Sequence, residues 1–195
     1  MKEPIETFSS RFVVLDADDV DTDQIIPARF LTTTERTGLR ACLFYDWRHR
    51  PDGTSLPDFA LNRPDAAGAR ILVTGRNFGC GSSREHAVWA LTDAGFRAVI
   101  SESFADIFRA NALGNGLLPI QVDSAVRGEL MRRPSATLSV DLGAQTLSRD
   151  GSILARFRID SFAKLCLMRG MDELEYLLSA DADIATHERK AAPAW

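Results

Sequence analysis

The residues best suited to chemistry stand together in residues 77–86, which read Asn-Phe-Gly-Cys-Gly-Ser-Ser-Arg-Glu-His. This segment follows a predicted strand and opens a predicted helix, and the free N–H groups and dipole at a helix N-terminus favour an anion. Arg84 adds a guanidinium that can bind both oxygens of a carboxylate. The pattern therefore predicts an anion-binding loop between a strand and a helix.

Two other interpretations of this loop rest on the same residues. Ser82 and Glu85 have the spacing of a capping box, so the segment can also be only the glycine-rich start of a helix. Gly79 and Gly81 form a G-x-G, but neither a third glycine at the dinucleotide spacing nor a Gly-Lys-Ser/Thr follows. Anion binding and helix capping both stay open, while nucleotide binding is disfavoured.

Metal ligands give a weaker signal. Carboxylates alternate over residues 16–23, but the downstream glycine and glutamate of an EF-hand loop are missing, so no metal is expected there. Cys42, Cys80 and Cys166 are odd in number and far apart, which fits neither a disulfide framework nor a zinc or iron–sulfur ligand set. Any metal chemistry must therefore use the ligands of a partner.

Composition indicates one folded domain over residues 1–195. Hydrophobic residues make up 45% and charged residues 26% of the chain, with a net charge of -4, which is typical of a globular protein. No basic field is expected to attract nucleic acid or anionic lipid, and the apolar run at residues 12–15 is too short for a signal or membrane segment. A cytoplasmic protein with a flexible tail from about residue 185 is expected.

Alternating strands and helices must position the loop. Short apolar runs predict buried strands at residues 11–15, 70–74, 98–101 and 117–122. Helices are predicted between the last three, one from about Ser83 to Gly95 and one over residues 103–114 with Ser103 at its start. This alternation predicts parallel strands.

A different pattern follows after residue 137. Apolar residues alternate over 138–142 and 153–159 around a turn at 149–152, which predicts antiparallel strands. Residues 161–180 are predicted to form one or two helices broken at Gly170, and residues 38–68 an irregular exposed stretch. The sequence thus predicts an α/β fold with a mixed sheet.

Three segments resemble one family. They are residues 77–86 with their Gly-Ser-Ser-Arg-Glu-His core, residues 19–31 (Asp-Val-Asp-Thr-Asp-Gln-Ile-Ile-Pro-Ala-Arg-Phe-Leu) and residues 103–108 (Ser-Phe-Ala-Asp-Ile-Phe). Together they resemble the 3-isopropylmalate dehydratase small subunits of the aconitase superfamily, from about residue 12 to at least 176. The resemblance implies the swivelling, β/β/α barrel-like domain of that superfamily.

The resemblance also implies roles for single residues. Ser82 becomes the catalytic base, and Ser83 and Arg84 bind a substrate carboxylate. A serine hydroxyl can act as a base only when its alkoxide is stabilised, which a helix N-terminus and a guanidinium can do. Asp23 is placed beside the site as an orienting group, and Gly81 and His86 of the same motif are predicted as supporting residues.

Substrate choice is assigned to Leu31 and Thr32. In related small subunits this loop senses the γ group of the substrate, and homoaconitase-like members carry an arginine where this chain has Thr32. The resemblance implies interconversion of 2-isopropylmalate and 3-isopropylmalate by dehydration and rehydration, in leucine biosynthesis.

A large subunit is the implied partner. In the family it holds a four-iron four-sulfur cluster that assists departure of the hydroxyl, so no cofactor is expected on this chain. The alternatives are the small subunit of a homoaconitase or related small-acid hydratase, and a non-enzymatic anion-binding module.

Overall fold

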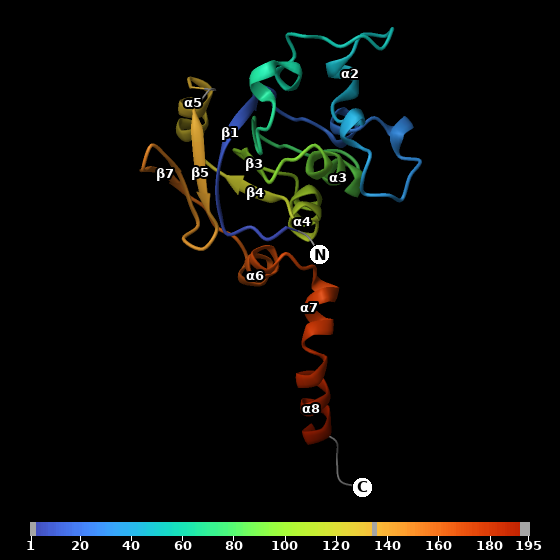
Figure 1. The fold of residues 1–195 in the computed structure, drawn as a ribbon, viewed down its shortest axis with the longest axis vertical. Helices are drawn as coiled ribbons and strands as arrows, with labels where there is room; N and C mark the ends of the chain where they lie inside the picture. The colour runs from blue at the N-terminus through green and yellow to red at the C-terminus, as the bar shows by residue number, and fades with distance from the viewer. Residues whose placement is uncertain (1–2, 134–135, 192–195) are drawn as a thin grey trace.

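A seven-stranded sheet forms the centre of the protein in a computed structural model that describes residues 3–133 and 136–191 (Figure 1). The strand order is β4-β3-β2-β1-β5-β6-β7. The strands are β1 (Thr7–Leu15), β2 (Ile71–Thr74), β3 (Ala98–Ser101), β4 (Leu118–Gln121), β5 (Thr137–Asp141), β6 (Thr146–Arg149) and β7 (Ser152–Arg156). Strands β1 to β4 are parallel, and β1 pairs antiparallel with β5, so β1 joins a parallel half to an antiparallel half.

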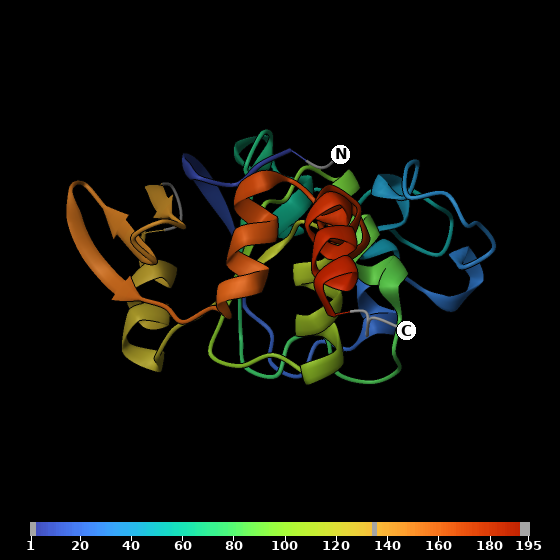
Figure 2. The same ribbon diagram turned by 90° about the horizontal axis from the view of Figure 1, so that it is seen from below.

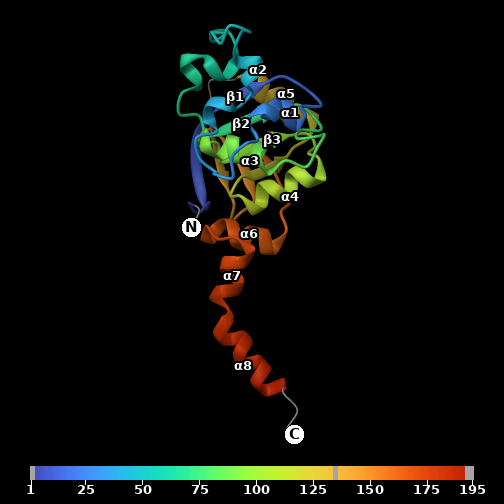
Figure 3. The same ribbon diagram turned by 90° about the vertical axis from the view of Figure 1, so that its right-hand side faces the viewer.

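Helices surround this curled, half-barrel sheet. They are α1 (Thr22–Ile25), α2 (Tyr45–Arg48), α3 (Glu85–Asp93), α4 (Asp106–Gly114), α5 (Ser124–Met131), α6 (Ser161–Arg169), α7 (Glu173–Ser179) and α8 (Asp181–Ala191). Short 3-10 turns lie at Ala28–Phe30, Arg40–Cys42, Ala60–Asn62 and Pro64–Ala66. Helices α7 and α8 extend from the body as an arm (Figures 1 and 3), and Figure 2 shows the β6–β7 hairpin and the α2 region at opposite ends.

Both faces of β2 are buried because neighbouring residues of this strand point to different apolar clusters. On β2, Leu72 belongs to a cluster that includes residues of α3 and α4, whereas Ile71 and Val73 belong to a second cluster that includes Leu130 of α5 and Leu167 of α6. All three β2 side chains are fully buried. The parallel strands are therefore held between two layers, and α3 is packed firmly against one of them.

The predicted parallel and antiparallel strands are confirmed, with β1 beginning earlier, at Thr7. Both predicted helices are confirmed, but each begins two to three residues later than predicted. Helix α3 begins at Glu85 and α4 at Asp106, with no side-chain cap at either N-terminus. Ser82 and Ser103 therefore do not cap these helices, because each lies in a loop held by long-range hydrogen bonds.

The C-terminal half contains elements that the sequence did not predict. Helix α5 and strand β6 were both missed, while the break at Gly170 is confirmed by its left-handed conformation, with φ 65°. Residues 38–68 are largely irregular, as expected, but they are not exposed throughout, because Leu39, Leu43 and Phe44 are buried in the core. Helix α8 runs to Ala191 across the start of the tail predicted from about residue 185, and the flexibility of that tail stays a prediction.

Candidate active site at the carboxyl end of the parallel strands

The loop that follows β2 is hydrogen-bonded to the segment that follows β1. Gly79 N–H donates to the Val20 carbonyl at 2.8 Å, and Thr22 N–H donates to the Cys80 carbonyl at 2.9 Å. The Thr22 hydroxyl donates to the Ser82 carbonyl, also at 2.9 Å. The backbone ahead of α3 is therefore fixed through Ser82 by a segment about sixty positions earlier in the chain.

The loop after β3 joins the same assembly. Phe78 N–H donates to the Ser103 carbonyl at 3.0 Å, and Ala105 N–H donates to the Phe78 carbonyl at 3.1 Å. The Ser103 hydroxyl accepts from Asn77 N–H at 2.8 Å, which explains why this serine does not cap α4. All three segments of the family resemblance thus meet at the carboxyl ends of the parallel strands, where open α/β sheets bind ligands.

Two glycines allow the loop to take this path. Gly79 has φ 78° and Gly81 has φ 86°, the left-handed region that glycine enters without a steric cost. A Cβ added to Gly79 would overlap the Phe108 ring, so α4 packs directly on the loop backbone. Gly81 is exposed and has more room, since a Cβ there would lie 3.3 Å from Asp21 Cβ.

Arg84 and Asp23 form an ion pair in front of α3. The Arg84 side chain is only 17% exposed, against 52% for Asp23, so the guanidinium is held in place while one side of the pair meets solvent. The hydrogen bond from Arg84 lowers the pKa of the Asp23 carboxyl, which keeps it ionised at neutral pH. Ser82 and Ser83 are both exposed immediately before Arg84. Two hydroxyls and one fixed cation can together bind an anion.

His86 connects α3 to the segment predicted to choose the substrate. Its Nε2 lies 2.8 Å from the Thr33 carbonyl oxygen, and because a carbonyl only accepts, Nε2 carries the proton. Leu31 is half-buried against the core, and Thr32 is exposed. The backbone at Thr33, the residue after Leu31 and Thr32, is therefore attached to the first turn of α3. The separation of His86 and Thr33 in the chain left the sequence without any signal for this pair.

Asn77 and Asp19 are site residues that the sequence analysis missed. Both have left-handed backbones, with φ 54° and 53°, and the Asn77 amide donates to the Asp19 carboxylate at 2.8 Å. Asn and Asp are the non-glycine residues that enter this region most readily, which was the available signal. This hydrogen bond holds the loop after β2 against the segment after β1.

The cysteine nearest the site is held as a thiol. Cys80 Sγ donates to the Asp19 carbonyl at 3.3 Å, and burial, reinforced by the carboxylates of Asp21 and Asp19, raises the pKa of Cys80. Over residues 3–133 and 136–191, no three His, Cys, Asp or Glu side chains are grouped so that they could hold a metal ion.

Known proteins resemble this chain both in sequence and in structure. Residues 5–125 match the family of aconitase C-terminal domains. The chain is 58% identical over 186 residues to the 3-isopropylmalate dehydratase small subunit of Anaeromyxobacter dehalogenans (strain 2CP-C), covering 95% of this chain and 97% of that one. It is 56% identical over 190 residues to the 3-isopropylmalate dehydratase small subunit of Chloroflexus aggregans, covering 95% and 93%. The crystal structure of 3-isopropylmalate dehydratase from Methanocaldococcus jannaschii aligns with a TM-score of 0.69 at 28% identity, over 93% of this chain and 99% of that one.

The sheet topology and the loop ahead of α3 thus define a domain of the aconitase C-terminal class. Within that class, the chain belongs to the family of 3-isopropylmalate dehydratase small subunits. The predicted superfamily and the α/β fold with a mixed sheet are confirmed. None of the helices in the described ranges has the length and apolarity needed to cross a bilayer.

Proposed function

We propose that this chain acts as the small subunit of a hydro-lyase that interconverts 2-isopropylmalate and 3-isopropylmalate, with Ser82 as the base and Arg84 as the carboxylate ligand. The reaction removes water to give an alkene diacid and adds it back in the opposite orientation. The ion pair of Arg84 with Asp23, directly behind two exposed serines, is the observation that carries this proposal. Identity of 58% to a relative of that name supports it.

Arg84 binds a substrate carboxylate through its planar fork. Loss of the proton from the adjacent carbon builds negative charge on that carboxylate, so a cation gripping both oxygens stabilises the transition state more than the ground state. Asp23 orients the guanidinium from the opposite side. Ser83, exposed beside Arg84, donates its hydroxyl to the same carboxylate.

Ser82 removes the proton. Its hydroxyl is exposed, while its carbonyl is held by the Thr22 hydroxyl, so the backbone stays fixed as the side chain reacts. The positive end of the α3 dipole and the Arg84 guanidinium both favour a negative oxygen at this position. Ser82 needs this support because an unassisted hydroxyl is too weak an acid to serve as a base at neutral pH.

A small subunit implies a large one, and we assign to that partner the four-iron four-sulfur cluster of the family. When bound, such a cluster supplies a Lewis acid for the departing hydroxyl. The absence of a cluster from this chain stays a prediction. We also propose that residues 1–195 move as one swivelling domain, that the assembly is cytoplasmic, and that its substrates are small 2-hydroxy and 3-hydroxy acids.

The test is the substitution Ser82→Ala in the enzyme assembled with its large subunit. We expect turnover of 3-isopropylmalate to fall about 100-fold to 10,000-fold, the contribution of a general base. Ser83→Ala should reduce turnover less, and Ser152→Ala, an exposed serine on β7, serves as the control. Near-normal turnover by Ser82→Ala with a full cluster would remove the base assignment.

A further inference from the structure

One face of α3 is attached to the segment from Leu31 to Arg40. Residues 86, 89 and 93 are three and four positions apart, so they lie in one stripe along the helix. The first attachment is the bond from His86 Nε2–H to the Thr33 carbonyl at 2.8 Å. Thr33 is the one half-buried residue of 32–38, and the other six are exposed.

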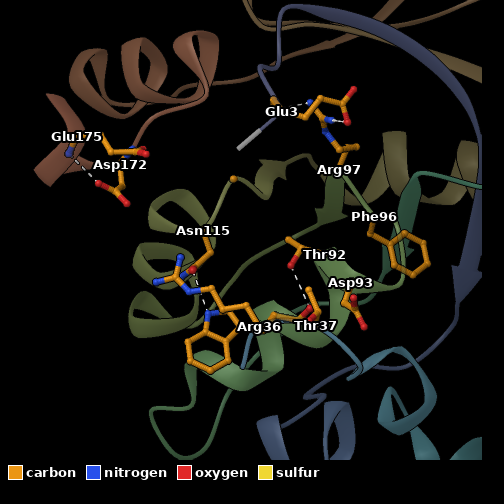
Figure 4. Close-up of a pocket in the computed structure, with 12 residues that line it drawn as sticks. Glu3, Arg36, Thr37, Thr92, Asp93, Phe96, Arg97, Asn115, Asp172 and Glu175 are labelled. Atoms are coloured by element: carbon orange, nitrogen blue, oxygen red, sulfur yellow. Dashed lines mark hydrogen bonds and ion pairs between the residues drawn. The ribbon is translucent and has the colours of Figure 1, made fainter. Parts of the chain in front are cut away.

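The second attachment joins Trp89 to Arg36. The Arg36 guanidinium lies 5.5 Å from the centroid of the Trp89 ring, a distance typical of a cation–π contact. The indole N–H of Trp89 donates to Asn115 Oδ1 at 3.0 Å, and the Asn115 amide donates to Glu85 at 2.7 Å. These hydrogen bonds therefore hold the Trp89 ring in place. Arg36, Trp89 and Asn115 all line one cavity of about 560 Å³, and Figure 4 labels Arg36 and Asn115 among its lining residues.

The third attachment lies at the C-terminal end of the segment, at Arg40. Arg40 N–H donates to Asp93 Oδ2 at 2.7 Å, and Leu39 is buried beside it, 3% exposed. The start of the segment is set by Phe30, whose ring lies 5.0 Å from that of Tyr45. Between these ends, the exposed residues depend on α3 for their position.

We propose that His86 and Trp89 are positioning residues for substrate selection. They hold Leu31 and Thr32 in place relative to Ser82 and Arg84, which stand immediately before the same helix. A shift of residues 32–36 away from α3 would leave the base untouched and would change the space available to the substrate's side group. This inference rests on the proposed function and on the prediction from the family resemblance that Leu31 and Thr32 face the substrate's side group.

The experiment uses the assembled enzyme with two substrates, 3-isopropylmalate and 3-methylmalate. His86→Leu removes the N–H donor at similar volume, and we expect the ratio of kcat/KM for 3-isopropylmalate over 3-methylmalate to fall about fivefold. The kcat for 3-methylmalate should stay within about twofold, because Ser82 and Arg84 keep their places. His86→Gln restores an N–H donor at comparable reach and should restore the ratio. His187→Leu, an exposed histidine on α8, is the matched control.

Amide hydrogen exchange over residues 32–38 of the same assemblies tests the attachment separately. His86→Leu and Trp89→Leu should both speed exchange in this segment relative to the wild type. Unchanged exchange, or faster exchange with an unchanged substrate ratio, overturns the inference while leaving the dehydratase activity standing. A wild-type assembly that does not turn over 3-isopropylmalate overturns the proposed function and this inference together.

Discussion

The role proposed for Arg84 makes two demands that few side chains meet at once. In this role, Arg84 must stay charged while it is mostly buried, and it must present a flat pair of donors to a carboxylate. Asp23 satisfies the first demand because its own carboxyl, with a lowered pKa, supplies a permanent counter-charge. The second demand is met by the guanidinium geometry, which a lysine does not share.

Arg84→Lys should therefore lower kcat/KM for 3-isopropylmalate by about 100-fold or more, since a point charge does not replace a bidentate fork in the transition state. Steady-state kinetics of the assembled enzyme measures it. Arg70→Lys is the matched control, because Arg70 pairs with Glu3 at the opposite end of β2 from the loop. Comparable kcat/KM values for the two variants would contradict the role given to Arg84.

At the level of single residues, the sequence indicated which residues belong to the candidate site better than it indicated which residues contact one another. The motif singled out Ser82, Arg84 and Asp23, and the structure pairs the last two. The capping interpretation of Ser82 is wrong because the Thr22 hydroxyl holds its carbonyl in a loop ahead of the helix. That bond joins residues far apart in the chain, so no local pattern could indicate it.

Among the elements, strands buried on both faces gave the strongest signal, and β6 gave too weak a signal to be predicted. Strands β2 and β3 each begin with three apolar residues and have every residue buried. Strand β6 reads Thr-Leu-Ser-Arg, and its buried Arg149 forms an ion pair with Glu129 of α5. Helix α5 buries only Leu130 and contains Gly128, so its periodicity is weak.

The loop ahead of α3 gives a prediction about packing between elements. Gly79→Ala should destabilise the protein by about 3 kcal/mol or more, since a positive φ and an overlap with Phe108 add together. Gly95→Ala is the matched control: φ is 98° there, but its Cβ would meet nothing within 4 Å, so about 1 kcal/mol is expected. Urea unfolding of both variants measures the difference, and equal losses would contradict the close approach of α4.

The segment attached to α3 gives a second prediction at this scale. Thr32→Arg should weaken use of 3-isopropylmalate and improve use of homoaconitate, because a guanidinium can pair with a γ-carboxylate but loses its solvation against methyl groups. Burying the isopropyl group contributes about 2 kcal/mol, so the segment shifts selectivity without deciding it alone. The measurement is the ratio of the two kcat/KM values. An unchanged ratio, or a wild type that already prefers the tricarboxylic acid, would contradict the assignment of Thr32.

Considered as a whole, the molecule carries the proposed base and the serine beside it on an open edge. Ser82 and Ser83 are exposed, and three loops bring them to the carboxyl ends of the parallel strands. Dehydration chemistry benefits from a closed, water-poor site, which an exposed edge does not form by itself. The second wall and the Lewis acid are what a large subunit would contribute.

The α/β class and the family were both predictable from the sequence, because three long motifs in order are specific. The arm of α7 and α8 was only partly predictable. It exposes Leu174, Leu177 and Leu178 at 65%, 54% and 67%, so it lacks the buried stripe that makes a helix easy to recognise. Its place relative to the body comes from Gly170 and the break after α6.

Reconstitution tests the central claim most directly. The purified chain is placed anaerobically with 3-isopropylmalate, first alone and then with its large subunit carrying the cluster, and formation of the alkene acid is followed by ultraviolet absorbance. The account predicts a colourless, inactive chain that becomes active only on mixing, and turnover lower by about 100-fold or more on mixing when Ser82→Ala replaces the wild type. Iron–sulfur absorbance or turnover from this chain alone, or equal turnover from the Ser82→Ala mixture, would contradict it.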